Sequence, residues 1–347
     1  MSVKISGEAA HALLGSTHCN WRAMGAPQRE RTIRINVARE KITVVGAGNV
    51  GATTAQRLVE AGCYDVVLLD IVDGIPQGKG LDLSQAYPLV GPLGKVEGTG
   101  DYKATAGSSV VIITSGVARK PGMTREQLLE TNAKIVKSVV EQAIQVSPDA
   151  ILLVVTNPLD VMTYVAYKTS KFPRQRVLGM AGVLDASRFR AFIAAELKVS
   201  AENVQTLVLG GHGDSMVPLI RYTTIAGVPL SEWLPPDRIE ALVNRTRDGG
   251  AEIVALLKTA SAYYAPSASI VTMVDAILQD SKKILPCAAM CCGEYGLNDV
   301  FIGVPVKLGC QGAEQIITLS LNAEEQAGLS KSAGLVKEMC AAVDGMI

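Results

Sequence analysis

Short apolar runs alternate along the first half of the chain with longer stretches in which apolar residues recur every three or four positions. The first pattern predicts strands and the second predicts amphipathic helices. The predicted strands are Lys41–Val45, Asp65–Leu69, Val110–Thr114 and Ile151–Val155, and the predicted helices are Ala52–Ala61 and Thr124–Ile144. Strands that alternate with helices favour a parallel sheet covered on both faces, so the fold class is α/β.

The second half of the chain has a mixed pattern. A helical run at Phe189–Leu197 is followed by a strand-like run at Val204–Leu209. Later segments predict two helices, of which the second is kinked or broken at Pro266, then an antiparallel strand pair with a turn between its strands, and a final helix. In chain order these are Ser231–Arg247, Ala251–Gln279, Lys282–Cys292, Gly293–Asn298, Val300–Leu308 and Asn322–Val343. This order is typical of an α+β domain.

A glycine-rich turn joins the first predicted strand to the first predicted helix. It reads Gly46-Ala47-Gly48-Asn49-Val50-Gly51. In this setting Gly46 permits a tight turn, Gly48 lets a pyrophosphate approach the backbone, and Gly51 lets the helix pack closely on the strand. The helix N-terminus then presents free N–H groups to the phosphates, with Asn49 and Val50 in the same turn. A glycine turn without a ligand is the alternative.

An acidic residue stands where a dinucleotide fold needs one. Asp70 ends the second predicted strand, 19 residues after Gly51, and Asp73 lies close by. A carboxylate there accepts hydrogen bonds from the adenosine ribose and repels a 2′-phosphate. No arginine follows Asp70 directly. The sequence therefore predicts an NAD-binding Rossmann domain over residues 40–182, a doubly wound parallel sheet, followed by an α+β substrate domain over residues 183–347.

The composition narrows the class of protein. The chain has 347 residues, 48% apolar and 19% charged, with 33 basic and 33 acidic residues. Zero net charge argues against binding nucleic acid through bulk positive charge, and no apolar run is long enough to span a membrane. Seven scattered cysteines favour a reducing compartment over a disulfide framework. Cys287, Cys291 and Cys292 lie in an apolar run without a nearby histidine, which favours a strand over a zinc site.

Residues 1–39 differ from the rest of the chain. They contain six basic and two acidic residues, a net charge of +4, which leaves −4 for residues 40–347. An Arg-rich, acid-poor leader is compatible with a mitochondrial transit peptide, which would place the protein in mitochondria. A disordered tail, an oligomerisation arm and an upstream start codon are the alternatives, and the protein would then be cytoplasmic.

A histidine between glycines marks the candidate chemistry. His212 follows the predicted strand Val204–Leu209 and is the only histidine after residue 39. Asp185 and Arg188, three residues apart, lie on one face of a predicted helix start. A carboxylate can orient an imidazole and stabilise its charged form, and an arginine can bind a substrate carboxylate with two parallel hydrogen bonds. A histidine that serves only as a satisfied polar residue is the alternative.

Two further arginines and an asparagine lie at the predicted carboxyl edge of the sheet. Arg119 and Arg125 belong to a loop rich in glycine and proline that follows the strand Val110–Thr114, and Asn157 follows the strand Ile151–Val155. Because ligands bind beyond the carboxyl ends of parallel strands, these side chains are expected near the cofactor. A solvated basic loop is the alternative for the two arginines.

Five motifs, in order, resemble the lactate/malate dehydrogenase family, and in particular its lactate-dehydrogenase-like malate dehydrogenases. They are GAGNVG (46–51), ITSGVARKPGMTR (113–125), VTNPLDVM (155–162), GVLDASRFR (182–190) and GGHGDSMVP (210–218). The similarity runs from about Lys41 to the C-terminus. It implies an NAD-dependent oxidoreductase that works as a homodimer or homotetramer on a small 2-hydroxy acid.

The resemblance also implies roles for the site residues. His212 is the proton donor and acceptor, and Asp185 is its partner. Arg188 binds the C1 carboxylate of the substrate, Arg125 polarises the carbonyl oxygen, and Asn157 hydrogen-bonds near that oxygen and the cofactor. The Asn157–Pro158 bond is similar to one that is cis in the family.

Arg119 separates two possible substrates. Malate enzymes carry arginine at the matching position, where lactate enzymes usually carry glutamine. Oxaloacetate has a second carboxylate where pyruvate has a methyl group, and burying that charge without a partner would cost several kcal/mol. We therefore expect malate and oxaloacetate as substrates. An L-lactate dehydrogenase of the same fold and a non-catalytic NAD-binding homologue are the alternatives.

Overall fold

The computed structural model describes residues 39–91, 94–118 and 123–345, and Arg39–Ile347 forms one compact unit. Six parallel strands form the first part of its main sheet: β1 (Glu40–Val45), β2 (Tyr64–Leu69), β3 (Val96–Thr99), β4 (Val110–Ile113), β5 (Ile151–Val154) and β6 (Val177–Gly179). Their spatial order is β3-β2-β1-β4-β5-β6. This is the order of a dinucleotide-binding fold, so the Rossmann prediction is confirmed.

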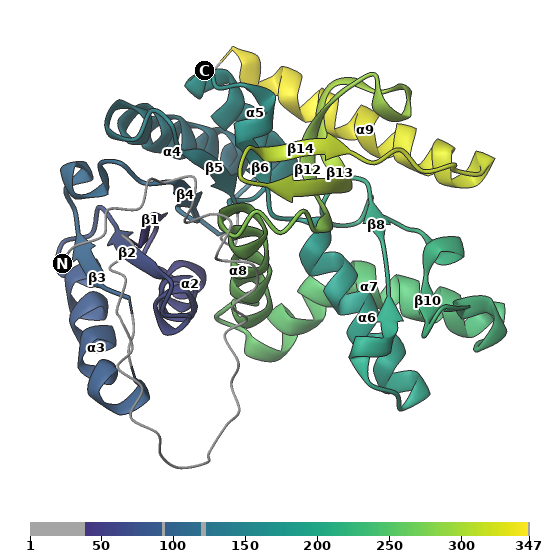
Figure 1. The fold of residues 1–347 in the computed structure, drawn as a ribbon. Coiled ribbons are helices and arrows are strands. Elements are labelled where there is room, and N and C mark those ends of the chain that lie inside the picture. Colours follow the sequence, from purple (N-terminus) through teal and green to yellow (C-terminus); the bar gives the residue numbers. More distant parts are fainter. Residues whose placement is uncertain (1–38, 92–93, 119–122, 346–347) are drawn as a thin grey trace, which may run out of the picture. The chain divides into compact units, whose positions relative to one another are not determined.

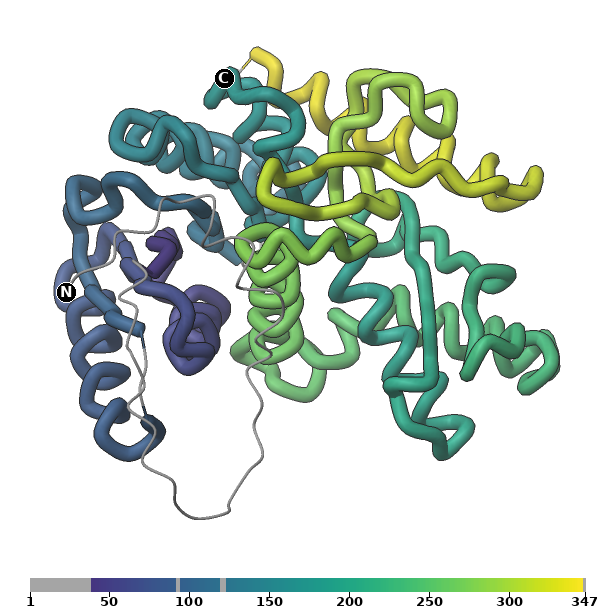
Figure 2. The backbone as a smooth tube through the Cα atoms, in the orientation of Figure 1, coloured from purple at the N-terminus to yellow at the C-terminus, as the bar shows by residue number. Residues whose placement is uncertain are grey.

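Three antiparallel strands from late in the chain extend the same sheet. They are β12 (Ile284–Cys292), β13 (Asn298–Gly309) and β14 (Gly312–Ile316). Ala288 of β12 pairs with Gly179 of β6, which makes the sheet nine-stranded. Figure 2 traces how this yellow-green hairpin returns to lie beside the teal strands of the first half. The predicted antiparallel pair is present, and Cys287, Cys291 and Cys292 all lie in β12.

Helices cover both faces of the sheet (Figure 1). They are α2 (Asn49–Glu60), α3 (Ile75–Val90), α4 (Arg125–Val146), α5 (Leu159–Ser170), α6 (Gly182–Leu197), α7 (Pro236–Leu257), α8 (Tyr264–Leu278) and α9 (Ala323–Asp344). Helix α8 packs against α2, whereas α4 packs against α5 and α5 against α9. Because both faces are covered, all four residues of β4 and of β5 are buried, which explains their continuous apolar sequence.

Short elements complete the second half. Strands β7 (Val204–Gln205), β10 (Thr224–Ile225) and β11 (Val228–Pro229) form one small sheet, and β8 (Val208–Leu209) pairs with β9 (Val217–Pro218). Single 3-10 turns occur at Tyr102–Thr105, Arg174–Arg176, Ala201–Asn203, Ile220–Tyr222, Leu230–Glu232 and Glu294–Gly296. The predicted strand Val204–Leu209 is thus wrong as a unit, because its two ends pair with different partners.

The bounds predicted for the helices Ser231–Arg247 and Ala251–Gln279 are also wrong. Helix α7 continues through Gly249 and Gly250, and the break falls at residues 258–263. Pro266 lies in the first turn of α8, where proline is tolerated because that N–H has no helical partner. Tertiary packing keeps the two glycines helical although glycine is a weak helix former.

Candidate active site

The turn between β1 and α2 has the geometry that a phosphate-binding loop requires. Gly46 has φ +105°, which side chains rarely adopt, and a Cβ on Gly51 would lie 1.8 Å from the carbonyl oxygen of Gly46. A Cβ on Gly48 would meet no atom within 4 Å, so open space faces this residue. No side chain caps α2 at Gly48 and its first turn carries no acid. The uncapped N–H groups at Asn49 and Val50 therefore suit a pyrophosphate, and the residues fit the dinucleotide.

Asp70 is held against this turn. Its Oδ2 accepts a hydrogen bond from the backbone N–H of Ala47 at 2.6 Å, and its Oδ1 accepts one from Val72 N–H at 3.0 Å. The Lys79 ammonium donates to the Ala47 carbonyl at 2.6 Å. Each carboxylate oxygen retains a lone pair, so Asp70 can still accept hydrogen bonds from ribose hydroxyls. Its position beside the glycine turn is the one that the sequence predicted.

His212 and Asp185 form a hydrogen-bonded pair. Nδ1 of His212 lies 2.9 Å from Oδ2 of Asp185, which belongs to the first turn of α6. The Asp185 side chain is 2% exposed and the His212 side chain 18% exposed. Burial alone would lower the pKa of His212, but the charge and hydrogen bond of Asp185 outweigh it, and the pKa is raised. An Nδ1–H that donates to Asp185 leaves Nε2 free to exchange a proton with a substrate.

Arg188 faces the second oxygen of the same carboxylate. Its Nη1 lies 3.4 Å from Asp185 Oδ1, and its side chain is 12% exposed. Burial lowers the pKa of this guanidinium, although Asp185 opposes the shift. Its Nε is buried and has no hydrogen-bond partner within the described part of the chain. This arginine therefore retains donors for an incoming carboxylate.

Glycines of α7 make room for Arg188. A Cβ on Gly249 would lie 3.2 Å from Arg188 Cδ, and one on Gly250 would lie 3.8 Å from Nη2. The guanidinium is thus packed between α6 and the middle of α7. A side chain at position 249 would therefore crowd Arg188, whereas one at position 250 would make only an ordinary van der Waals contact.

Four hydrogen bonds fix the segment that carries His212. Gly210 exchanges two backbone hydrogen bonds with Gly303 of β13, and Gly211 N–H donates to Ser332 Oγ of α9 at 2.8 Å. His212 N–H donates to Asp160 Oδ2 of α5 at 2.9 Å. Neither Ser332 nor Asp160 was predicted as part of the site. Asp160 belongs to the motif that contains Asn157, which was the available signal.

Asn157 lies at the end of β5, where its side chain is exposed, and its bond to Pro158 is cis. Its carbonyl accepts a hydrogen bond from Asn132 Nδ2 at 2.7 Å. Asn132 is buried in α4 and also accepts from Val117 N–H at 2.8 Å, so one side chain ties together the segments after β4 and β5. No sequence pattern points to Asn132, because it appears only as one polar residue within an amphipathic helix.

The structure describes one of the two loop arginines, Arg125, and does not pair it with His212. Arg125 is the first residue of α4, is exposed, and makes no hydrogen bond or ion pair with Asp185 or His212 in the described part of the chain. Thr124 and Gln127 cap this helix reciprocally, which fixes where it begins. Arg119 lies outside the described residues. The roles of both arginines stay predictions.

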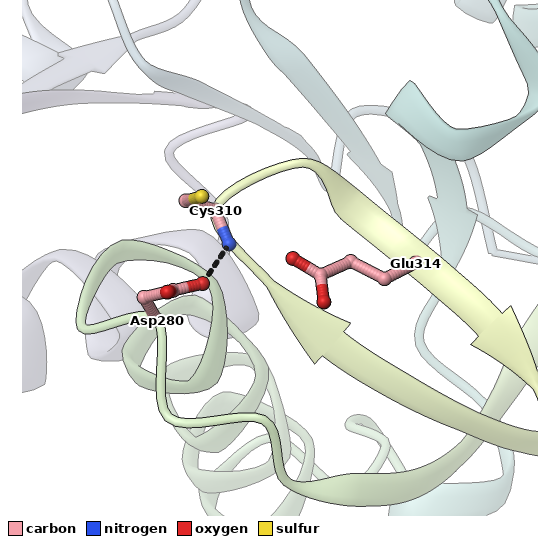
Figure 3. Close-up of side chains that lie close together, drawn as sticks. All are labelled: Asp280, Cys310 and Glu314. Carbon is pink, nitrogen blue, oxygen red and sulfur yellow. Dashed lines mark hydrogen bonds between the residues drawn. The ribbon is translucent and has the colours of Figure 1, made fainter.

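A cluster of possible metal ligands lies elsewhere, at the turn between β13 and β14 (Figure 3). It consists of Asp280, Cys310 and Glu314. The Lys282 ammonium lies 2.6 Å from both Asp280 and Glu314, so a built-in cation already pairs with both carboxylates and offsets part of their charge. Asp280 also accepts a hydrogen bond from Cys310 N–H.

Among the described residues, no helix is both long and apolar enough to cross a membrane.

A dinucleotide-binding sheet joined to a half that presents a histidine, a carboxylate and an arginine defines the architecture of a nucleotide-dependent dehydrogenase. The family profile described as "lactate/malate dehydrogenase, NAD binding domain" matches residues 40–179, and "lactate/malate dehydrogenase, alpha/beta C-terminal domain" matches residues 182–344. The chain belongs to the lactate/malate dehydrogenase family, as the motifs predicted.

Similar proteins carry both names. Malate dehydrogenase of Chloroherpeton thalassium is 59% identical over 308 residues, which are 88% of this chain and 99% of that protein. The solved malate dehydrogenase of Salinibacter ruber has a TM-score of 0.85 at 52% identity, covering 88% of this chain and 98% of that one. The lactate dehydrogenase of Cryptosporidium parvum, solved with lactic acid and nicotinamide adenine dinucleotide, has a TM-score of 0.86 at 42% identity, covering 89% and 99%. The fold alone therefore does not separate malate from lactate enzymes.

Proposed function

We propose that this chain catalyses the reversible, NAD-dependent oxidation of malate to oxaloacetate. The observation that carries the proposal is the His212–Asp185–Arg188 group, in which one buried carboxylate contacts both an imidazole and a guanidinium. A glycine-rich turn with open space at Gly48 accompanies it. Malate dehydrogenases at 54–59% identity over almost their whole length support the substrate.

His212 moves the proton. In malate oxidation, neutral His212 accepts the proton of the substrate hydroxyl at Nε2, while Asp185 stabilises the imidazolium that forms. In the reverse direction, the imidazolium returns that proton to the carbonyl oxygen of oxaloacetate. Bound NAD supplies the redox chemistry, by accepting a hydride from C2 of malate or, when reduced, returning it.

Arginines bind the dianion. Arg188 holds the C1 carboxylate with its guanidinium, whose Nε has no hydrogen-bond partner among the described residues. Arg119 pairs with the second carboxylate, and Arg125 stabilises charge that develops on the reacting oxygen. Asn157, at the end of β5, donates to the same oxygen. Its backbone is held by Asn132, which gives this position the rigidity that such a contact requires.

The substrate comparison tests this proposal. We expect kcat/KM with NADH to be at least 10²-fold higher for oxaloacetate than for pyruvate, because bound pyruvate would leave the proposed partner of the second carboxylate, Arg119, without an anion. A preference for pyruvate would replace the malate assignment with the lactate one. Binding of NADH without turnover of either acid would favour a non-catalytic homologue.

We further propose that residues 1–39 direct import into mitochondria and are then removed. The support is the net charge of +4 in this segment, together with a family match that begins at residue 40. N-terminal sequencing of the mature protein from fractionated cells tests this. A mature N-terminus near residue 40 in the mitochondrial fraction is expected, whereas an intact leader in the cytoplasm would overturn the proposal.

The oligomeric state that we propose, a homodimer or homotetramer, is measurable on the same material by light scattering.

A further inference from the structure

Asp160 is a buried acid that the proposed mechanism does not use. It belongs to the first turn of α5 and is 5% exposed. Its Oδ2 accepts the His212 backbone N–H at 2.9 Å, and its Oδ1 is buried without a hydrogen-bond partner among the described residues. A neutral acceptor would satisfy one N–H equally well. Burying a carboxylate with one oxygen unpaired costs free energy, so we expect an interaction that the negative charge serves.

The charged groups around Asp160 and His212 show which interaction this is. His212 is faced by Asp185 and Arg188 from α6 and by Asp160 from α5. Asp160 is faced in turn by His212, Asp185 and, from α9, by Cys340. Arg188 and Asp185 compensate each other in part through their ion pair. Asp160 has no ion-pair partner within the described residues, so its charge acts on the imidazole without a competing cation of its own.

We propose that Asp160 is a positioning residue for His212, fixing its backbone through the N–H and stabilising its imidazolium through a second buried negative charge. This inference rests on the proposed function only in that His212 is taken as the proton carrier. Two acids from two helices then act on one ring. Asp185 orients it at Nδ1, and Asp160 anchors the main chain and adds to the electrostatic field.

The ionisation of Asp160 is itself linked to His212. Burial raises the pKa of Asp160 to about 6, against the opposing effects of the His212 N–H and the His212 charge. The pKa of His212 is raised as well. Two interacting ionisable groups give macroscopic titration steps that belong to the pair. We therefore expect the ionisation of Asp160 to produce a visible step in the titration curve of His212.

Asp160→Asn separates charge from hydrogen bonding. Its amide oxygen can still accept the His212 N–H, whereas the negative charge is lost. The matched control is Asp275→Asn, the same change at an acid that accepts from the Tyr64 hydroxyl at 2.7 Å at the start of β2, the opposite end of that strand from the site. With three histidines in the chain, ring signals of ¹³C-labelled histidine in the full-length protein identify His212 after comparison with His212→Asn.

We expect Asp160→Asn to lower the His212 titration midpoint by roughly 0.5–1 unit, as for loss of a nearby opposite charge, and Asp275→Asn to leave it unchanged. The pH midpoint of the rise in kcat/KM for malate should fall by the same amount, while the KM for NAD stays constant. Equal midpoints in both variants would overturn the proposal. A shifted midpoint in a protein without malate activity would refute the proposed function and leave this inference standing.

The unaltered protein gives a second measurement if Asp160→Asn does not fold. The His212 ring signal should then show a second inflection near pH 6, and the side-chain carboxyl carbon of Asp160 should titrate in the same range. A His212 curve with one inflection, together with an Asp160 signal that titrates at the ordinary pH of an aspartate, would overturn the proposal by an independent route.

Discussion

His212 Nδ1 and Asp185 Oδ2 lie 2.9 Å apart, and the other oxygen of Asp185 lies 3.4 Å from Arg188 Nη1. One buried carboxylate therefore contacts both the proposed proton carrier and the proposed carboxylate-binding group. A change in the charge of this acid should alter proton transfer and substrate binding together. The dependence of the site on pH comes from His212, whose pKa is raised.

The first prediction concerns that pH dependence. Because the pKa of His212 is raised, the imidazolium persists to a higher pH than for an ordinary histidine. Oxaloacetate reduction needs the protonated ring, so its kcat/KM should fall as pH rises through this pKa. Malate oxidation needs the neutral ring, so its kcat/KM should rise through the same pKa. Initial rates in both directions between pH 5 and 10 test this, and inflections below the ordinary histidine value of about 6.5 would contradict it.

The second prediction concerns Asp185→Asn. The amide keeps the size of the side chain but removes the charge that stabilises the imidazolium, and its NH₂ group can turn toward Nδ1 and favour the wrong tautomer. We expect kcat to fall by roughly 10²- to 10⁴-fold, as for an acid that orients a catalytic histidine. The KM for malate should also rise, because Arg188 loses its partner. Steady-state kinetics at saturating NAD measure both.

A surface variant controls for the loss of charge. Glu196→Gln removes an acid from an exposed ion pair with Arg238, and such pairs contribute little. It should leave both kinetic constants near those of the unaltered protein. If Asp185→Asn behaves like this control, the proposed role of Asp185 is wrong.

Most of the sheet could be predicted because its determinants are local. The apolar runs at β4 and β5 and the glycine turn after β1 each depend on a few adjacent residues, and the structure has each of them at the predicted place. The split of residues 204–209 into β7 and β8 depends instead on distant partners, the segment at β10 and the segment at β9. No periodicity in six residues records which partner each end will find.

The same distinction holds for the site. His212, Asp185 and Arg188 stand out because their motifs are compact, and the structure brings these three together. Asp160 and Ser332 each accept one hydrogen bond from the backbone of residues 211–212, across 52 and 121 positions of the sequence. Such contacts depend on how α5 and α9 pack, and a single polar residue in a helical pattern does not reveal them.

The third prediction separates two glycines of one motif. Gly51→Ala places a Cβ 1.8 Å from the Gly46 carbonyl oxygen, a backbone overlap that only a shift of α2 can relieve. We expect a loss of roughly 2 kcal/mol or more in the free energy of unfolding, the cost of overpacking against rigid atoms. Gly48→Ala meets no atom within 4 Å, so its stability should be nearly unchanged while its affinity for NAD falls.

Denaturant unfolding and NADH fluorescence titration measure these two effects. Gly334→Ala is the control, because a Cβ there also meets open space but lies in α9, away from the glycine turn. It should unfold at the same or slightly higher denaturant concentration and bind NADH normally. A Gly48→Ala protein with unchanged affinity would contradict the assignment of this turn to the pyrophosphate.

The last prediction concerns Arg119→Gln, the change that most directly tests the substrate. Glutamine keeps hydrogen-bonding capacity but has no charge, so the second carboxylate of oxaloacetate would be desolvated without a counter-ion. We expect kcat/KM for oxaloacetate to fall by about 10²-fold or more and the preference over pyruvate to shrink accordingly. Arg119→Lys serves as the partner variant, because lysine keeps the charge but not the planar pair of donors. Its kcat/KM for oxaloacetate should lie between those of the unaltered protein and Arg119→Gln. The affinity for NADH should stay constant in both variants, since the proposed contact is with substrate alone. An unchanged ratio of oxaloacetate to pyruvate activity in Arg119→Gln would assign the discrimination to another residue of the pocket.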